Sequence, residues 1–243
     1  GGDTVHGLGE IAGIDLELHP VRLLKISTPN RGSGFAIEDE RFAVVAHPMS
    51  LLAFDISIEL PPLSAPITGL RVVMHTPPGH PEEGWGFGGK AGKRSFALTS
   101  LSVSGGPVPG DQVNLYQLLP MRRVTASGWD GENRPEGVLG TSSANAWIPD
   151  PAADGPVHLT ASFAAPLDPE RTRFLTAQLN FGRFGDMTAR RMEFFVVTGE
   201  DDDSELPREM QDALTTTPET RTEQQRAAIR REFVEHAPAT ARV

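Results

Sequence analysis

The stretch that decides the fold is residues 54–60, which read Phe-Asp-Ile-Ser-Ile-Glu-Leu and are followed by Pro61 and Pro62. Apolar residues occupy every second position, and the residues between them are polar or charged. Because successive side chains of a β-strand point to opposite faces of a sheet, this alternation predicts a strand with one buried face. The two prolines predict its end, since proline cannot donate to a sheet ladder.

Similar segments recur along the first 199 residues, each bounded by Pro, Gly, Asn or Asp. They predict at least eight strands, and the 25 glycines and 21 prolines favour many turns over long helices. This pattern predicts an all-β fold, a β-sandwich of the jelly-roll or discoidin-like kind. The predicted strands lie in residues 14–26 with a break at Pro20, 42–45, 51–60, 67–75, 95–104, 112–119, 157–164, 174–181 and 192–197.

The composition changes after Gly199, so we divide the chain into a β-sandwich domain, residues 1–199, and an acidic linker with a short helical C-terminal tail, residues 200–243. Asp201, Asp202 and Asp203 begin the linker. Residues 206–214 and 222–233 are predicted helices, the second opened by a capping box in which Thr222 is followed three residues later by Gln225. Ile229 and Phe233 lie on roughly one face of it, which predicts packing against the sandwich or a neighbouring domain.

Composition excludes several classes of function. The formal net charge of -10 argues against nucleic acid as a partner, because phosphate binding requires clustered Lys and Arg. No run reaches the ~18 apolar residues of a transmembrane helix, so no transmembrane segment is expected. With no cysteine, the chain has no disulfide, no thiolate zinc site and no cysteine nucleophile.

Three tryptophans lie in Gly-, Pro- or Asn-rich segments that predict loops. Trp85, Trp129 and Trp147 are candidate platforms for stacking on a sugar ring. The polar residues expected to donate hydrogen bonds beside them are Arg94, Asn133 and Asn145. The alternative is that each tryptophan anchors its own loop against the core, as buried tryptophans commonly do.

One loop also carries a candidate metal site. Asp130, Glu132 and Asn133 place three oxygen ligands within four residues, which is compatible with a structural calcium. Solvated loop acids are the alternative, and the expected cofactor is therefore none or a structural calcium. The seven histidines form none of the paired motifs typical of zinc sites.

The order of these segments resembles a region of large planctomycete-type secreted proteins, between a cytochrome-associated domain and a second planctomycete-specific domain. The resemblance rests on short motifs spread over residues 21–238. Ala146 and Ser95 depart from it, because the family has glycine and asparagine there. The motifs are Ile-Thr-Gly-Leu-Arg-Val-Val-Met at 67–74, Phe-Ala-Leu-Thr-Ser-Leu-Ser-Val at 96–103, Trp-Asp-Gly at 129–131, Ala-Trp-Ile at 146–148, the strand and Gly-Arg-Phe of 174–184, and the connector segments 206–209 and 221–226.

This resemblance implies a periplasmic or cell-surface setting beside other domains, and a sandwich similar to discoidin and other carbohydrate-binding modules. We therefore expect a non-catalytic binding module that recognises polysaccharide through loop aromatics, within a larger exported protein or assembly. Two alternatives stay open: a structural or assembly subunit with protein partners, and a glycoside-acting hydrolase. The second is the weaker, because no catalytic motif such as a Gly-x-Ser-x-Gly elbow is present; it stays open because acid pairs for glycoside hydrolysis form only in the tertiary structure.

Overall fold

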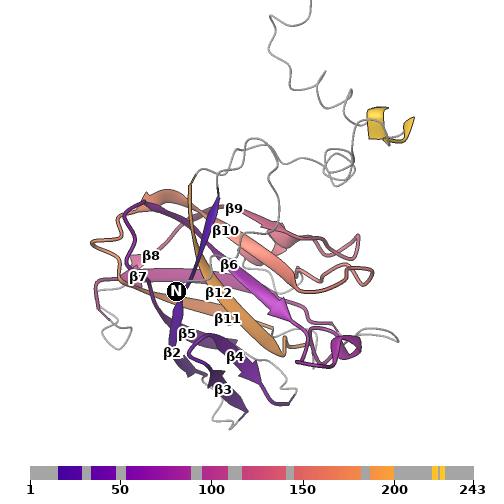
Figure 1. Cartoon of the computed structure of the whole chain (residues 1–243), viewed down its shortest axis with the longest axis horizontal. Helices are drawn as coiled ribbons and strands as arrows, with labels where there is room; N and C mark the ends of the chain where they lie inside the picture. Colours follow the sequence, from indigo (N-terminus) through magenta and orange to yellow (C-terminus); the bar gives the residue numbers. More distant parts are fainter. Residues whose placement is uncertain are drawn as a thin grey trace, which may run out of the picture. The chain divides into compact units, whose positions relative to one another are not determined.

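The fold is seen in a computed structural model that describes residues 16–28, 34–47, 53–88, 95–108, 117–140, 145–181, 187–199, 221–223 and 225–227. Residues Leu16–Gly199 form one compact unit. Its strands pair in two antiparallel sheets, which we call sheet A and sheet B (Figure 1). This confirms the prediction of an all-β sandwich.

Each sheet is continuous across strands that lie far apart in the chain. Sheet A runs β3 (Phe35–Glu38), β4 (Phe42–Val45), β12 (Arg191–Thr198), β6 (Ile67–His75), β10 (Val157–Leu167) and β9 (Met121–Ala126), with β1 (Glu17–Pro20) also paired to β12. Sheet B runs β2 (Arg22–Ser27), β5 (Ala53–Glu59), β11 (Phe174–Asn180), β7 (Ser100–Gly106) and β8 (Gln117–Leu118). Two short 3-10 helices, η1 (Pro81–Glu83) and η3 (Pro135–Leu139), lie in connections.

The strand pairing is nested, which is the order typical of a jelly roll. Strand β4 pairs with β12, β5 with β11, β6 with β10, and β7 with β8. The chain alternates between sheets on the way in, through β4, β5, β6 and β7, and again on the way out, through β10, β11 and β12. Folding a long antiparallel hairpin over itself in this way produces two facing sheets.

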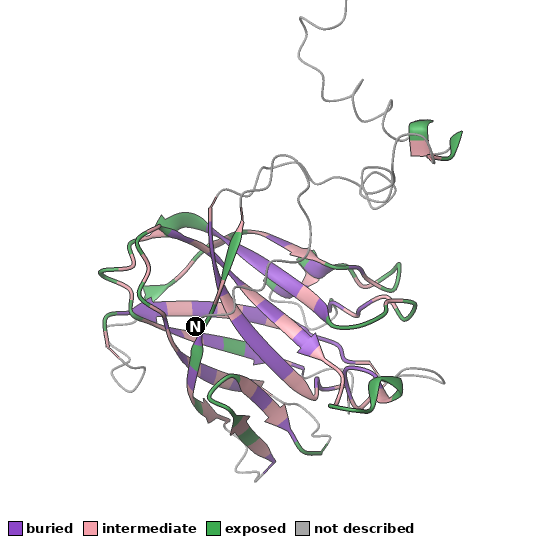
Figure 2. Ribbon diagram, in the orientation of Figure 1, coloured by how far each residue is buried: buried purple, intermediate pink, exposed green. Residues whose placement is uncertain are grey.

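The core lies between the sheets and is filled by the alternating apolar residues of each strand. Phe54, Ile56 and Ile58 of β5 are all buried. They lie opposite apolar residues of β11, with Phe54 facing Leu179 and Ile58 facing Leu175. Buried and more exposed residues accordingly alternate along the central strands (Figure 2). The deciding stretch therefore behaves as its alternation predicts.

Most predicted strands match observed ones. The ranges 42–45 and 67–75 are confirmed without change, and the break predicted at Pro20 falls at Val21, between β1 and β2. Strands β3 and β9 were missed. Strand β9 contains a single buried side chain, Val124, and so lacks the apolar alternation of a half-buried strand. Strand β3 does alternate, with Phe35 and Ile37 packed against the core, but it is only four residues long.

The tail is described only at residues 221–223 and 225–227, and these confirm the predicted capping box. The Thr222 backbone N–H donates to Gln225 Oε1 at 2.9 Å, and the Gln225 N–H donates to Thr222 Oγ1 at 3.2 Å. Glu223 and residues 225–227 are helical. The predicted helix 206–214, the acidic run 201–203, and Ile229 and Phe233 lie outside the described residues.

One histidine is held neutral by its place on sheet A. His158 lies on β10, half-buried, opposite Val73 of β6. Burial, together with the positive charge of the nearby Arg71, lowers the pKa of His158 to about 4 from the ordinary value of 6.5. The imidazole therefore resists protonation in the folded state and accepts it once the chain unfolds.

This pKa predicts acid sensitivity. Between pH 6.5 and 4 the unfolded chain binds a proton that the folded chain does not, so stability falls as the pH is lowered, by about 3 kcal/mol over the window. We expect the free energy of unfolding, measured with urea at pH 7 and at pH 5, to fall by about 2 kcal/mol less in His158→Gln than in the wild type. His47→Gln, at an exposed position, is the control. Parallel pH profiles of wild type and His158→Gln would contradict the assignment.

Candidate functional site

Four connections gather at one end of the sandwich, which we call the loop end. They are residues 46–52, 76–99, 127–156 and 181–190, because β4, β6, β9 and β11 all run toward that end. Isolated bridges join Gly86 to Ala189 and Leu98 to Trp147, which ties three of these connections together. A Cβ at Gly86 would overlap the Ser95 carbonyl, so this close approach requires glycine. The described residues of these three connections thus form a hydrogen-bonded cap on the core.

Two of the predicted sugar platforms lie inside this cap. Trp85 is 1% exposed and Trp147 is 0% exposed. The Trp85 indole N–H donates to the Gly155 carbonyl at 2.8 Å, and the Trp147 indole N–H donates to the Gly128 carbonyl at 2.9 Å. Trp147 also packs edge-on against Phe96, with ring centroids 5.1 Å apart. The prediction that these rings stack on a ligand is therefore wrong, because both complete the core beneath their loops.

This burial predicts a stability effect that separates the tryptophans. Trp147→Ala removes a fully buried ring and should lower the free energy of unfolding by about 3–5 kcal/mol. Trp129→Ala removes a half-buried ring and should cost less than about 2 kcal/mol. Urea titration followed by circular dichroism measures both. Equal losses from the two substitutions would contradict the assigned burial.

The other predicted ligand residues are Trp129, Asn133, Asn145 and Arg94. Trp129 is half-buried, packs against the core, and has the Arg134 guanidinium 5.7 Å from its ring centroid. Asn145 is exposed. Arg94 lies outside the described residues. Trp129 is therefore the one predicted platform that keeps part of its ring at the surface.

The predicted calcium ligands are organised by hydrogen bonds within their own loop. Asp130 Oδ1 accepts from the backbone N–H of Glu132 at 3.0 Å and of Asn133 at 2.7 Å. The Asn133 side-chain amide donates to Asp130 Oδ2 at 2.8 Å. Both oxygens of Asp130 thus accept protein donors, as in an Asx-turn. A structural calcium there stays a prediction from the sequence.

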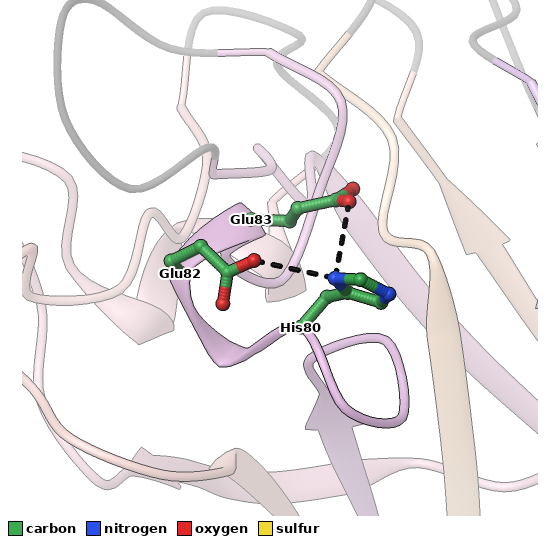
Figure 3. Close-up of side chains that lie close together, drawn as sticks. All are labelled: His80, Glu82 and Glu83. Carbon is green, nitrogen blue, oxygen red and sulfur yellow. Dashed lines mark hydrogen bonds and ion pairs between the residues drawn. The ribbon is translucent and has the colours of Figure 1, made fainter.

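A second group of metal-ligand types lies on η1 and was missed from the sequence, where His80 reads as a surface histidine. His80 Nδ1 is 3.3 Å from Glu82 Oε1 and 4.0 Å from Glu83 Oε1 (Figure 3). The signal was the spacing His-x-Glu-Glu on a tight turn that starts at Pro81. Because a 3-10 turn has about three residues per turn, it brings His80 and Glu83 to one side.

We call His80, Glu83 and Arg190 the loop clamp, because their contacts join two connections. Arg190 forms an ion pair with Glu83 and donates to the Gly86 carbonyl at 2.9 Å through Nε. The same guanidinium lies over the Phe87 ring, 4.5 Å from its centroid. The backbone N–H of Glu82, followed by His80, lowers the pKa of the Glu82 carboxyl. The group therefore links the 76–99 connection to Arg190.

The outer face of sheet A carries a buried carboxylate. Glu193 of β12 is 3% exposed, accepts from His75 Nε2 at 2.8 Å and pairs with Arg41. Burial alone would raise the pKa of Glu193, but the hydrogen bonds and charges of His75 and Arg41 outweigh it and hold the pKa below its usual value. Arg41 and Arg191 both lie over the Phe42 ring. These contacts fasten the β3–β4 hairpin to β12 and β6.

The outer face of sheet B has a different chemistry. The residues that alternate with the core positions of β5, β7 and β11 are small and mostly uncharged. Gln178 lies opposite Asp55 and Ser102, and Thr176 lies opposite Ser57 and Ser104. We call these six residues the sheet B face: Asp55, Ser57, Ser102, Ser104, Thr176 and Gln178. All are partly or fully exposed.

A side-chain hydrogen bond orders the sheet B face, and charged residues lie at its border. The Gln178 side-chain amide donates to Asp55 Oδ1 at 2.9 Å. Arg22 donates to Glu59 at 2.6 Å from Nε, one row beyond Ser57. An outward sheet face is ordinarily polar, but long Lys, Glu and Arg side chains usually supply that polarity. Here they lie at the margin, and hydroxyl and amide groups hold the centre.

Comparison with protein-family models and with curated protein sequences finds no match to this chain. The planctomycete-type resemblance therefore stays a prediction from the sequence. Among the residues that the structure describes, no helix is long and apolar enough to cross a membrane.

Proposed function

We propose that this chain is a non-catalytic binding module that recognises a neutral polysaccharide on the sheet B face. The observation that carries the proposal is the two-row array of hydroxyl and amide groups across β5, β11 and β7. Such groups both donate and accept hydrogen bonds, as do the hydroxyls of a sugar. The proposal keeps the ligand class expected from the sequence and moves its site from the loop tryptophans to the sheet.

Charge supports a neutral ligand over an ionic one. The chain has a formal net charge of -10, yet five of the six residues of the sheet B face are uncharged, and the sixth, Asp55, accepts from Gln178. A phosphate or sulfate polymer would require clustered cations. A basic protein would favour clustered carboxylates at the centre of the face. A polyhydroxylated ligand requires neither.

The spacing of the acids argues against hydrolysis on this face. Asp55 and Glu59 both point outward from β5 and are four residues apart, which corresponds to roughly 13 Å along an extended strand. Acid pairs of glycoside hydrolases are about 5–10 Å apart. Glu59 is also bound to Arg22. Binding without cleavage is therefore the function that these acids favour.

The test removes two polar groups from the sheet B face. Thr176→Val is isosteric, and combining it with Gln178→Ala removes one hydroxyl and one amide from the face. With about 0.5–1.5 kcal/mol per hydrogen bond, the double variant should bind its polysaccharide about tenfold more weakly. Isothermal titration calorimetry against soluble xylan, hydroxyethylcellulose, glucomannan and β-1,3-glucan, after a glycan array, measures the affinity.

The matched control is Thr125→Val, the same change on the outer face of sheet A, where Thr125 of β9 lies opposite Thr160. It should bind as the wild type does. Failure of the wild type to bind any glycan on the array would refute carbohydrate recognition and leave the assembly alternative, in which the same face meets a protein. Equal loss in Thr125→Val and in the double variant would mean that the sheet B face is not the site.

A further inference from the structure

We infer that Phe174 is the aromatic subsite of this module, on which a pyranose ring stacks while the sheet B face holds the hydroxyls of the adjoining sugar. This inference rests on the proposed function and adds the residue that gives the site its selectivity. Its ligand class is a neutral pyranose polymer with equatorial hydroxyls, such as xylan or a β-1,4-glucan. Rings of this kind present a flat face of C–H groups to an aromatic side chain.

The register places Phe174 on the same side of sheet B as Thr176 and Gln178. Leu175, Ala177 and Leu179 alternate with them and are fully buried in the core. Phe174 is partly exposed, and it is not among the half-buried apolar residues that pack against the core. An aromatic ring therefore lies at the outer surface of the sheet, one row from the hydroxyl array.

The two cross-strand partners of Phe174 differ in kind. Its partner on β7 is Gly106, which has no side chain, and its partner on β5 is Glu59. Arg22 holds the Glu59 carboxylate. Gly106 is itself buried and places no side chain beside the ring, and Arg22 fixes the acid on the other side. The part of the ring that a sugar can contact is therefore the exposed part that faces away from the sheet.

The next row supplies contacts at a suitable spacing. Thr176, Ser57 and Ser104 lie two residues further along their strands, roughly 7 Å from the row of Phe174. Leu118 of β8 lies opposite Ser104 and is 70% exposed, the most exposed of the large apolar side chains that the structure describes. The corner therefore combines a ring, an apolar side chain and hydroxyls, the combination that binds the amphipathic surface of a sugar polymer.

A competing explanation is structural. An aromatic residue across from a strand glycine can shield that glycine and stabilise the sheet. Shielding predicts that Phe174 affects stability and leaves binding unchanged. Stacking predicts that Phe174 affects binding affinity more than stability. Measuring affinity and thermal stability on the same variants therefore separates the two explanations.

The experiment compares the full chain with Phe174→Leu and Phe174→Trp, using xylan and hydroxyethylcellulose as probes and galactan, whose rings carry an axial hydroxyl, as the selectivity control. Phe174→Leu should bind about tenfold more weakly, because it keeps apolar bulk but loses the flat ring. Phe174→Trp should bind within about threefold of the wild type. Phe42→Leu, a half-buried phenylalanine on the outer face of sheet A, is the matched control and should bind normally.

Fluorescence of Phe174→Trp gives a second measurement that does not depend on loss of binding. Its emission should shift to the blue on addition of xylan, beyond any shift in the wild type, whose Trp85 and Trp147 are buried. Wild-type binding that Phe174→Leu leaves unchanged, or an unshifted emission at saturating xylan, overturns the subsite. In both of these outcomes the proposed function still stands, provided that the wild type binds and that the double variant Thr176→Val, Gln178→Ala binds more weakly. If the wild type binds nothing, the proposed function fails first.

Discussion

The packing of β5 and β11 against sheet A is the interaction on which the rest of the structure depends. Phe54, Ile56 and Ile58 face Leu179, Ala177 and Leu175 across the strand pair, and all six are buried. Because side chains alternate between the faces of a sheet, burying this set forces the intervening residues outward. The sheet B face is therefore a direct consequence of the core: a one-residue slip of β11 would bury Thr176 and Gln178 and expose Leu175 and Leu179.

The loop end depends on the same core in a different way. Its connections are long, but Trp85 and Trp147 extend the core into them. The Trp85 indole N–H donates to a carbonyl of the 127–156 connection, and the Trp147 indole N–H donates to a carbonyl of its own connection. A buried tryptophan with a hydrogen-bonded N–H stabilises the loop that carries it. The clamp of Arg190, Glu83 and His80 adds polar ties at the edge of the cap. The described residues of these long loops are therefore a stabilised part of the domain.

The two outer sheet faces have diverged in chemistry. Sheet A holds an ionised carboxylate, two arginines and a histidine around Phe42, and these groups satisfy one another. A buried charge that is fully partnered is costly to disturb, so it favours a structural role. Sheet B exposes small neutral groups that a ligand can engage without displacing an ion pair. This contrast, more than any single residue, directs the functional proposal to sheet B.

The sequence by itself determined the sandwich, most strand ranges and the capping box at Thr222, because these follow from local alternation, proline positions and short-range hydrogen bonds. It missed β3, which is only four residues long, and β9, in which Val124 is the single buried side chain. It left Trp85 and Trp147 open between surface platforms and loop anchors, and only the tertiary structure decided that they are core. A ring in a Gly-rich loop has the same local signal whether it faces solvent or protein. The sheet B face and Phe174 likewise emerged only from cross-strand register, which joins residues more than a hundred positions apart.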